Sequence, residues 1–236
     1  QHKMCEILGE ETMIPSFDVN STCSSFLTAL DTVSYFLESG RYQRILLVAC
    51  DTGSLALNEN QRDSYELFSD AAVATIVEGT KEEKGILAAH MLTDPRGITA
   101  TQIRGGGSLL PPYQYTKENH EAYLFDMNGP QTLRITKKAI DIFIPQLLEK
   151  ATMTKDDFDF IIPHQASLAL KLIVKHLKLN PDKTLDLVKD FGNMVTASVP
   201  FGLQYAIQHK LVKEGDTILL LGTAAGISIN GIILKL

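Results

Sequence analysis

The spacing of apolar residues changes along the chain, and the changes mark successive helices and strands. Residues 24–38 carry apolar residues three or four positions apart, which is typical of a helix with one buried face, and Gly40 follows where a helix-ending glycine is common. Residues 17–19, 44–51, 71–79 and 85–92 are short runs of mainly apolar residues and are predicted to be strands. The apolar positions of the helix are Phe26, Leu27, Leu30, Val33 and Leu37.

The second half continues the same alternation. A long loop is predicted from Thr93 to about Asn128, followed by a helix from Pro130 and a strand over residues 158–163. A further helix is expected to turn Val199, Leu203, Ala206, Ile207 and Leu211 inward. Two apolar strands then flank a turn of small residues near Gly222 and Gly226. The pattern as a whole indicates an α/β protein.

Two stretches share one plan. Residues 21–53 and residues 192–226 each contain a turn, an amphipathic helix, a glycine and an apolar strand, in nearly the same length. Each strand is expected to be followed by another. This favours a weak internal duplication with two pseudo-symmetric halves.

Composition narrows the class of protein. The chain has 236 residues, 44% of them hydrophobic and 21% charged, which is typical of a globular protein. Its three cysteines, Cys5, Cys23 and Cys50, form no Cys-x-x-Cys pair, so neither a disulfide framework nor a zinc site is expected, and Cys5 and Cys50 are interpreted as core residues. A reducing compartment, by default the cytoplasm, is favoured. The net charge of −6, without a basic stripe, gives no support for binding nucleic acid.

Nothing in the sequence predicts a membrane segment or a phosphate loop. The tract ILLLGTAAGISINGIILKL is interrupted by glycines and an asparagine, so it is interpreted as two strands, and the first residues lack the apolar core of a signal peptide. The triple glycine at residues 105–107 lacks the preceding strand and the Lys-Ser/Thr pair of a phosphate-binding loop.

Cys23 stands where the predicted strand of residues 17–19 turns into the first helix. Unpaired N–H groups and the positive end of the helix dipole would favour a thiolate there. The dipole contributes only about 0.3–2 kcal/mol, so a base or a cation is still needed. Because free cysteines are often buried packing residues, the window alone leaves both a nucleophile and an inert core residue open.

His164 follows the strand of residues 158–163 directly. In α/β sheets, ligands usually bind in the crevice outside the carboxyl ends of the strands, so a ligand or substrate contact is one interpretation. A hydrogen-bonded structural histidine is the other.

Three motifs together resemble a known family. FDVNSTCSSFLTAL, IIPHQASL and FGNMVTASVP are similar to the cysteine, histidine and asparagine motifs of β-ketoacyl-[acyl carrier protein] synthase III, a thiolase-fold condensing enzyme, in the same order and approximate spacing. The segment MNGPQTLRITKKAI resembles the family segment that opens the second half. The match extends over essentially the whole chain.

The resemblance implies a fold and its division. A thiolase-like α/β fold is expected, with two pseudo-duplicated halves in a layered αβαβα arrangement. Residues 1–80 would be the later part of the N-terminal half, and residues 81–236 the C-terminal half. The start of the first half is expected to be missing, so the chain is expected to be a fragment.

The resemblance also implies a reaction and its residues. Cys23 would accept an acyl group from a thioester, and His164 and Asn193 would donate hydrogen bonds to a malonyl thioester as it loses carbon dioxide and condenses to a 3-oxoacyl product. The backbone N–H groups of Cys23 and Ala225 would form the oxyanion hole. Acyl-coenzyme A or acyl carrier protein thioesters would be the substrates, with no metal and no permanently bound cofactor, in a cytoplasmic homodimer.

Several positions depart from the family pattern. A Phe-Gly-Gly-Gly turn is replaced by residues 223–226 (TAAG), so the acyl pocket or its gating is expected to differ. Ser167 and Ala169 stand where the family has Asn and Arg near the pantetheine and carrier-protein entrance, which puts coenzyme A specificity in doubt and makes Ser167 a candidate substrate or carrier-protein contact. Lys171 and Lys175, with Lys178, are candidates for contact with an acidic carrier protein, and an ordinary solvated face is the alternative.

Two other classes of function remain open from the sequence. One is an acyltransferase or polyketide-type synthase on the same fold that forms an ester, an amide or another carbon–carbon bond. The other is a non-catalytic partner subunit, which the presence of Cys23, His164 and Asn193 disfavours.

Overall fold

The structure, a computed structural model, describes residues 6–7, 9 and 13–236, so Cys5 lies outside the described residues. The helices and strands that position the site are α2 (Ser25–Glu38), β1 (Arg44–Asp51), α3 (Arg62–Tyr65), β2 (Ala71–Glu78), β3 (Gly85–Gly97), β4 (Thr101–Gln102), β5 (Asp126–Met127), α4 (Gly129–Ala151), β6 (Phe160–Pro163), α5 (Leu170–His176), α6 (Val188–Phe191), α7 (Ser198–Gln208), β7 (Thr217–Ala224) and β8 (Gly226–Lys235).

The strands form two main sheets. β1 and β2 pair antiparallel, and the larger sheet has the order β3-β8-β7-β6, in which β6 runs parallel to β7 and the other pairs are antiparallel. The predicted duplication is visible in the element order, because α2, β1 and β2 correspond to α7, β7 and β8, each a helix followed by an antiparallel pair.

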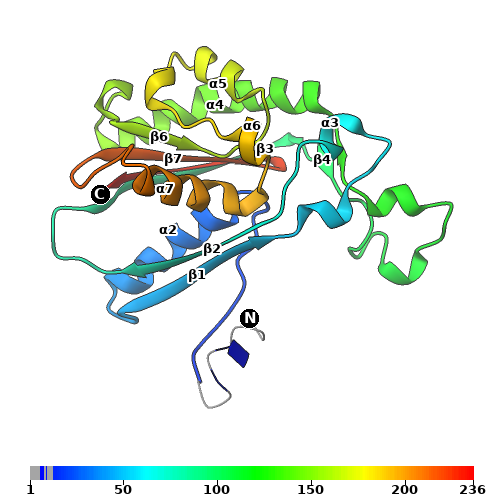
Figure 1. Ribbon diagram of the computed structural model, residues 1–236, viewed down its shortest axis with the longest axis horizontal. Coiled ribbons are helices and arrows are strands. Elements are labelled where there is room, and N and C mark those ends of the chain that lie inside the picture. Colours follow the sequence, from blue (N-terminus) through cyan, green and yellow to red (C-terminus); the bar gives the residue numbers. More distant parts are fainter. Residues whose placement is uncertain (1–5, 8, 10–12) are drawn as a thin grey trace.

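The elements stack in layers (Figure 1). Helices α2 and α7 lie between the β1–β2 pair and the larger sheet, and α4 packs on the opposite face of the larger sheet. Two clusters of buried side chains hold these layers together. One surrounds α2 and α7 and includes Leu27, Leu30 and Val199, and the other lies under α4 and includes Ile140 and Phe143.

Several sequence-based expectations hold. Helix α2 covers the predicted segment, and Gly40 has a positive φ of 71° just beyond its end. The strand β6 leads directly to His164. As a separate finding, the described helices include no candidate membrane span.

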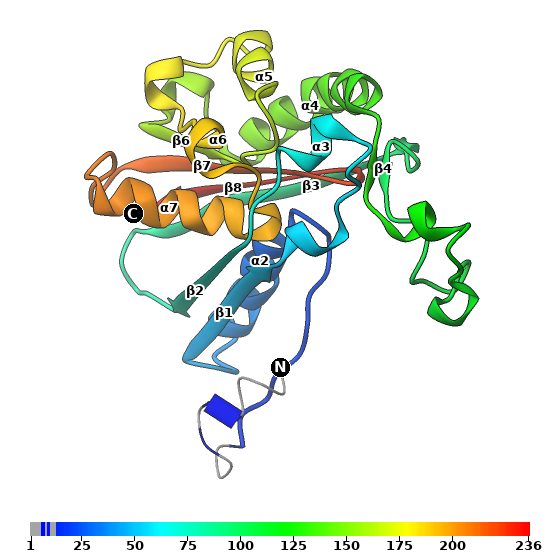
Figure 2. The same cartoon turned by 45° about the vertical axis from the view of Figure 1, so that its right-hand side comes forward.

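Other expectations are wrong in detail. Residues 17–19 form no strand in the described chain, since they find no partner strand there. The strand β3 continues to Gly97, so the loop predicted from Thr93 is shorter and also contains β4 and β5. The residues between β4 and β5 extend away from the layers (Figure 2).

Two inward-facing residues predicted for α7 are exposed. Ile207 and Leu211 are 49% and 45% exposed, whereas Val199 and Ala206 are buried. Ile207 lies about 100° around the helix from Ala206, which faces the core, and Leu211 follows the end of the helix. The buried face of α7 is therefore narrower than the apolar pattern indicated.

Cys50 is exposed and is not a core residue. Side chains alternate along β1, so Leu47 and Ala49 face the α2–α7 layer while Leu46, Val48 and Cys50 face outward. No described element covers the outer face of β1. Cys50 is therefore exposed although it lies in an apolar strand.

Candidate active site

Cys23 lies in a tight turn immediately before α2. Its neighbour Thr22 has a positive φ of 52°, and Ser24 is the residue before the first helical position, Ser25. The turn is fastened by side chains: Asn20 Oδ1 accepts a hydrogen bond from the Thr22 N–H (2.9 Å), and Ser25 Oγ accepts one from the Ser21 N–H (2.9 Å). The turn holds the half-buried Cys23 at the helix N-terminus, as the sequence predicted.

The protonation state of Cys23 differs from the expectation. Burial and the nearby carboxylate of Asp51 raise the pKa of the Cys23 thiol to about 12, against the opposing effect of a hydrogen bond from its own backbone N–H. The resting thiol is therefore protonated, and the position at the helix N-terminus does not by itself make Cys23 a thiolate. Desolvation is the main cause, because a thiolate at this place loses much of its water.

His164 is a buried residue at the carboxyl end of β6. Its backbone N–H donates to the Leu221 carbonyl of β7 (2.7 Å), and its side chain is 4% exposed. Nδ1 finds no hydrogen-bond partner among the residues that the structure describes. Burial lowers the pKa of His164 to about 4, so the imidazole is neutral at physiological pH.

Asn193 is held from both ends of its side-chain amide. Oδ1 accepts a hydrogen bond from the Val195 N–H (2.9 Å), and Nδ2 donates to the Ala166 carbonyl (3.1 Å), two residues after His164. The Asn193 backbone N–H donates to the Leu67 carbonyl (2.8 Å). Asn193 therefore links its own turn to the loop that follows His164, and one N–H of its amide remains available to a ligand.

The three segments converge on the β7–β8 end of the larger sheet. A Cβ placed on Gly222 of β7 would lie 3.0 Å from Ser24 Oγ and 2.8 Å from Leu27 Cδ1, so the start of α2 packs directly on that strand. The neighbouring Leu221 binds the His164 N–H, and Asn193 binds Ala166. Residues far apart in the sequence thus meet, and a glycine at position 222 makes the close approach possible.

The remaining predicted residues lie on three other segments. Ala225 forms the turn between β7 and β8. Ser167 Oγ accepts a hydrogen bond from the Ala169 N–H (3.2 Å) before α5 begins, and Lys171 forms an ion pair with Asp186 (3.6 Å).

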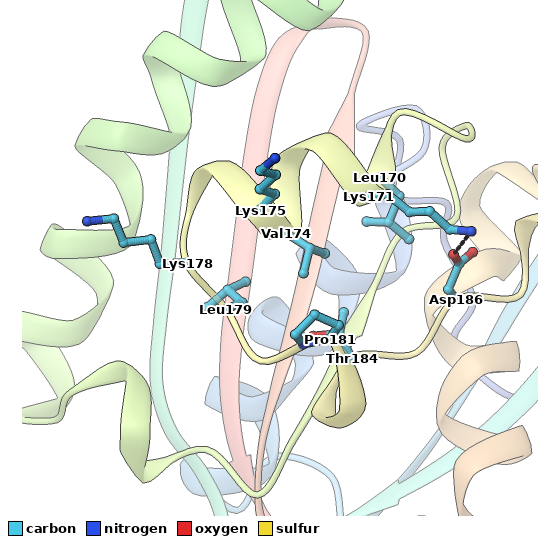
Figure 3. Close-up of a pocket in the computed structure, with 9 residues that line it drawn as sticks. All are labelled: Leu170, Lys171, Val174, Lys175, Lys178, Leu179, Pro181, Thr184 and Asp186. Atoms are coloured by element: carbon cyan, nitrogen blue, oxygen red, sulfur yellow. Dashed lines mark ion pairs between the residues drawn. The ribbon is translucent and has the colours of Figure 1, made fainter.

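Lys171 and Lys175 border a groove of about 550 Å³ beside α5. Figure 3 shows the lysine side chains around an apolar lining that includes Val174 and Pro181, and the Lys171–Asp186 pair closes one end. The groove is separate from the turn that holds Cys23.

Sequence reasoning missed three polar residues that support this site. Gln165 is fully buried and donates from Nε2 to the Pro163 and Leu185 carbonyls (2.8 and 3.2 Å). The Thr196 backbone N–H donates a hydrogen bond to the Asp51 carboxylate at the end of β1. The sequence feature that could have identified Asp51 is its place at the carboxyl end of the apolar strand RILLVACD. Among the described residues, no group of His, Cys, Asp or Glu could hold a metal ion.

The burial of His164 predicts that acid destabilises the protein. The ordinary pKa of 6.5 falls to about 4 on folding, so the unfolded chain binds more protons between these values. The part of the free energy of unfolding that depends on a neutral His164 is fully present above pH 6.5 and is lost as the pH falls towards 4. Between pH 7 and 5 this amounts to about 2 kcal/mol.

Urea unfolding of the original protein and of His164→Gln at the two pH values measures this contribution. We expect the variant to lose about 2 kcal/mol less free energy of unfolding on acidification, since glutamine does not titrate. An equal loss in both proteins would contradict the prediction.

The sequence matches family models and curated proteins over most of its length. Residues 17–95 match the family model described as 3-oxoacyl-[acyl-carrier-protein (ACP)] synthase III, and residues 148–236 match that for its C-terminal part. The chain is 34% identical over 221 residues to a beta-ketoacyl-[acyl-carrier-protein] synthase III of Syntrophomonas wolfei (93% of this chain, 66% of that protein). It is 32% identical over 222 residues to the protein of the same name from Clostridium perfringens (94% and 68%).

The structure resembles the crystal structure of 3-oxoacyl-[acyl-carrier-protein] synthase III from Aquifex aeolicus, with a TM-score of 0.86, 23% sequence identity, and coverage of 99% of this chain and 71% of that one. The likeness confirms the expected thiolase-like fold. The chain spans about two thirds of the length of the curated relatives that it matches.

Proposed function

The chain belongs to the 3-oxoacyl-[acyl-carrier-protein] synthase III family, and from this premise we propose that the protein is a condensing acyltransferase of that type. It would join an acyl group to the two carbons that remain when a malonyl group loses carbon dioxide. The observation that carries the proposal is the convergence of the segments bearing Cys23, His164 and Asn193 at one end of the larger sheet.

In the first half-reaction, Cys23 sulfur attacks the carbonyl carbon of an acyl thioester. A carbon–sulfur bond to Cys23 forms, the bond to the donor sulfur breaks, and the Cys23 proton ends on the departing thiol. Since burial keeps the Cys23 thiol protonated at rest, proton loss has to accompany the attack. We assign the oxyanion to the backbone N–H groups of Cys23 and Ala225, because the turns that contain them flank the close approach at Gly222.

In the second half-reaction, a malonyl thioester releases carbon dioxide and its carbonyl oxygen gains enolate charge. We assign hydrogen bonds to this oxygen to His164 and Asn193. A neutral imidazole and a carboxamide both donate without losing a charge, and burial keeps His164 neutral. The enolate carbon then attacks the acyl carbonyl, the carbon–sulfur bond to Cys23 breaks, and the Cys23 sulfur takes up a proton from water.

The same proposal covers the organisation of the chain. We place the boundary between the halves at residues 80 and 81, a division supported by the separate β1–β2 pair and by the start of the larger sheet at Gly85. We propose a cytoplasmic homodimer that acts on acyl-coenzyme A or acyl carrier protein thioesters without a permanently bound cofactor, as the family resemblance implies.

Intact-mass spectrometry of the full-length protein tests the function. The protein is incubated with a panel of acyl-coenzyme A and acyl-carrier-protein donors, and then with malonyl-carrier protein. We expect a donor-dependent mass gain on the Cys23 peptide that malonyl-carrier protein discharges to a 3-oxoacyl product. No gain with any donor would contradict an enzyme, and discharge only by alcohols or amines would indicate an ester- or amide-forming acyltransferase.

The lysines of α5 supply a testable docking surface for the carrier protein. Lys171 and Lys175 are exposed beside an apolar groove, a combination that suits an acidic helix with apolar side chains. Reversing both charges (Lys171→Glu with Lys175→Glu) should raise KM for malonyl-carrier protein about tenfold, through repulsion and a slower encounter. Steady-state kinetics over a range of salt concentrations measures this.

Lys81→Glu is the matched control, since Lys81 is an exposed lysine on the β2–β3 connection, outside the groove. Loading from acyl-coenzyme A should stay within about twofold in all variants, because a small donor does not need the lysines for encounter. An unchanged KM for malonyl-carrier protein in the double variant would assign the lysines to an ordinary solvated face.

A further inference from the structure

Asp51 ends the strand β1 beside the site and bonds to the main chain. Its Oδ2 accepts a hydrogen bond from the Thr196 N–H at 3.0 Å. Burial raises the pKa of Asp51, and the hydrogen bond from Thr196 opposes this. No cationic side chain of the described chain forms an ion pair with Asp51. Burying part of a carboxylate without a cationic partner costs free energy. Asp51 is therefore expected to have a role other than ion pairing.

Thr196 connects this carboxylate to α2. While its N–H donates to Asp51, its Oγ1 accepts a hydrogen bond from the Phe26 N–H at 3.0 Å. The Phe26 amide belongs to the first turn of α2, where N–H groups have no partner within the helix. One threonine therefore joins the end of β1 to the helix that begins just after Cys23.

Thr196 also follows a strained residue. Val195 has a φ of 50°, a left-handed conformation that a β-branched residue rarely adopts because it is sterically strained. Its N–H is held by Asn193 Oδ1, and the next N–H along the chain is held by Asp51. Such strain persists only where the surroundings enforce it, and here the enforcing groups are Asn193 on one side and Asp51 on the other.

We propose that Asp51 and Thr196 are positioning residues that hold the Asn193 turn against the first turn of α2, and so fix the Asn193 amide relative to Cys23 for condensation. The inference rests on the proposed function. Neither residue touches substrate in this role. Both act through hydrogen bonds of 3.0 Å that connect β1, the turn of residues 193–196 and α2.

Thr196→Val tests the connection, with Thr196→Ser as the matched control. Valine keeps the shape and the N–H but removes the oxygen that accepts from Phe26, whereas serine keeps that oxygen. We expect the ratio of the discharge rate, by malonyl-carrier protein, to the loading rate to fall about 10- to 100-fold in Thr196→Val and to return to within a few-fold in Thr196→Ser. An unchanged ratio in Thr196→Val would overturn the proposal.

Asp51→Asn and Asp51→Ala separate charge from position. Asparagine retains an oxygen that can accept from the Thr196 N–H, so its discharge-to-loading ratio should stay within a few-fold, while alanine should resemble Thr196→Val. Equal ratios in the two variants would also overturn the proposal. Since the Asp51 carboxylate helps to raise the pKa of Cys23, Asp51→Asn should in addition speed alkylation of Cys23 by iodoacetamide at any given pH, which is a shift of the alkylation profile to lower pH.

Alkylation and acyl loading together distinguish an error in the proposed function from an error in the positioning role of Asp51 and Thr196. It needs no acyl donor and no synthase activity. If Asp51→Asn shifts the alkylation profile while the unmodified protein is loaded by no thioester, the proposed function is wrong and so is the inference that rests on it. If the protein loads and condenses normally in Thr196→Val and Asp51→Ala, the function stands and the positioning role is wrong.

Discussion

Cys23→Ala abolishes covalent loading by every acyl thioester donor, and this is the largest effect that we expect from any single substitution. Alanine has no atom that can carry the acyl group, so the acyl-enzyme cannot form and 3-oxoacyl product should fall by at least about 10⁴-fold. Intact-mass spectrometry after incubation with donor measures the adduct, and product analysis measures the condensation. Since the Cys23 side chain is half-buried, the smaller alanine should leave the fold intact.

Cys50→Ala is the control for Cys23→Ala. Cys50 is also a free cysteine, but it lies on the exposed face of β1. This variant should load and condense within about twofold of the original protein, since surface substitutions away from the site have small effects. A full adduct on Cys23→Ala, or loss of the adduct in Cys50→Ala, would transfer the nucleophile to another residue.

His164→Ala and Asn193→Ala should separate the two half-reactions. Loading needs Cys23 and the oxyanion hole, so an acyl-enzyme forms in both variants. Condensation then fails, because each variant removes a hydrogen-bond donor from the developing enolate, a loss that typically costs about 10²–10³-fold in rate. The acyl-enzyme should accumulate, which a time course of intact mass in the presence of malonyl-carrier protein reveals.

The alanine variant of Asn193 also loses the bonds to Val195 and Ala166, so a second variant of the same shape is needed. Asn193→Asp keeps the oxygen that accepts from the Val195 N–H, but it can donate neither to Ala166 nor to the enolate. It should accumulate acyl-enzyme as Asn193→Ala does, and circular dichroism checks that it folds, because its second oxygen faces the Ala166 carbonyl. If the His164 variant condensed malonyl substrate at the normal rate, the assigned roles would be wrong.

Much of the fold could be predicted from the sequence because the relevant signals are local. The three-to-four spacing of Phe26, Leu27, Leu30 and Val33 defines α2, and the residues after β6 place His164 at a strand end. The duplication was visible because each helix-then-strand module repeats its own turns and periodicity. The motif order then indicated the family.

The remainder depends on contacts that no local pattern reveals. Cys50 is an apolar strand residue whose burial is decided by what covers the outer face of β1, and residues 17–19 need a partner strand that the described chain does not supply. The pKa of Cys23 depends on burial and on Asp51, which is distant in the sequence. The Asp51–Thr196 hydrogen bond joins residues 145 positions apart, so only the folded structure reveals it.

The topology of the larger sheet has a consequence for biosynthesis. The strand β8 lies between β3 and β7, and it pairs along its length with β3, whose residues precede it by well over a hundred positions. During translation β3 emerges early and must wait for β8, with its apolar side chains exposed in the meantime. Pairing at such separation is slow, and waiting strands are prone to aggregate. We therefore expect the nascent chain to depend on chaperones, and the approach at Gly222 that brings the start of α2 to the strand beside His164 to form only when the ribosome has delivered β7.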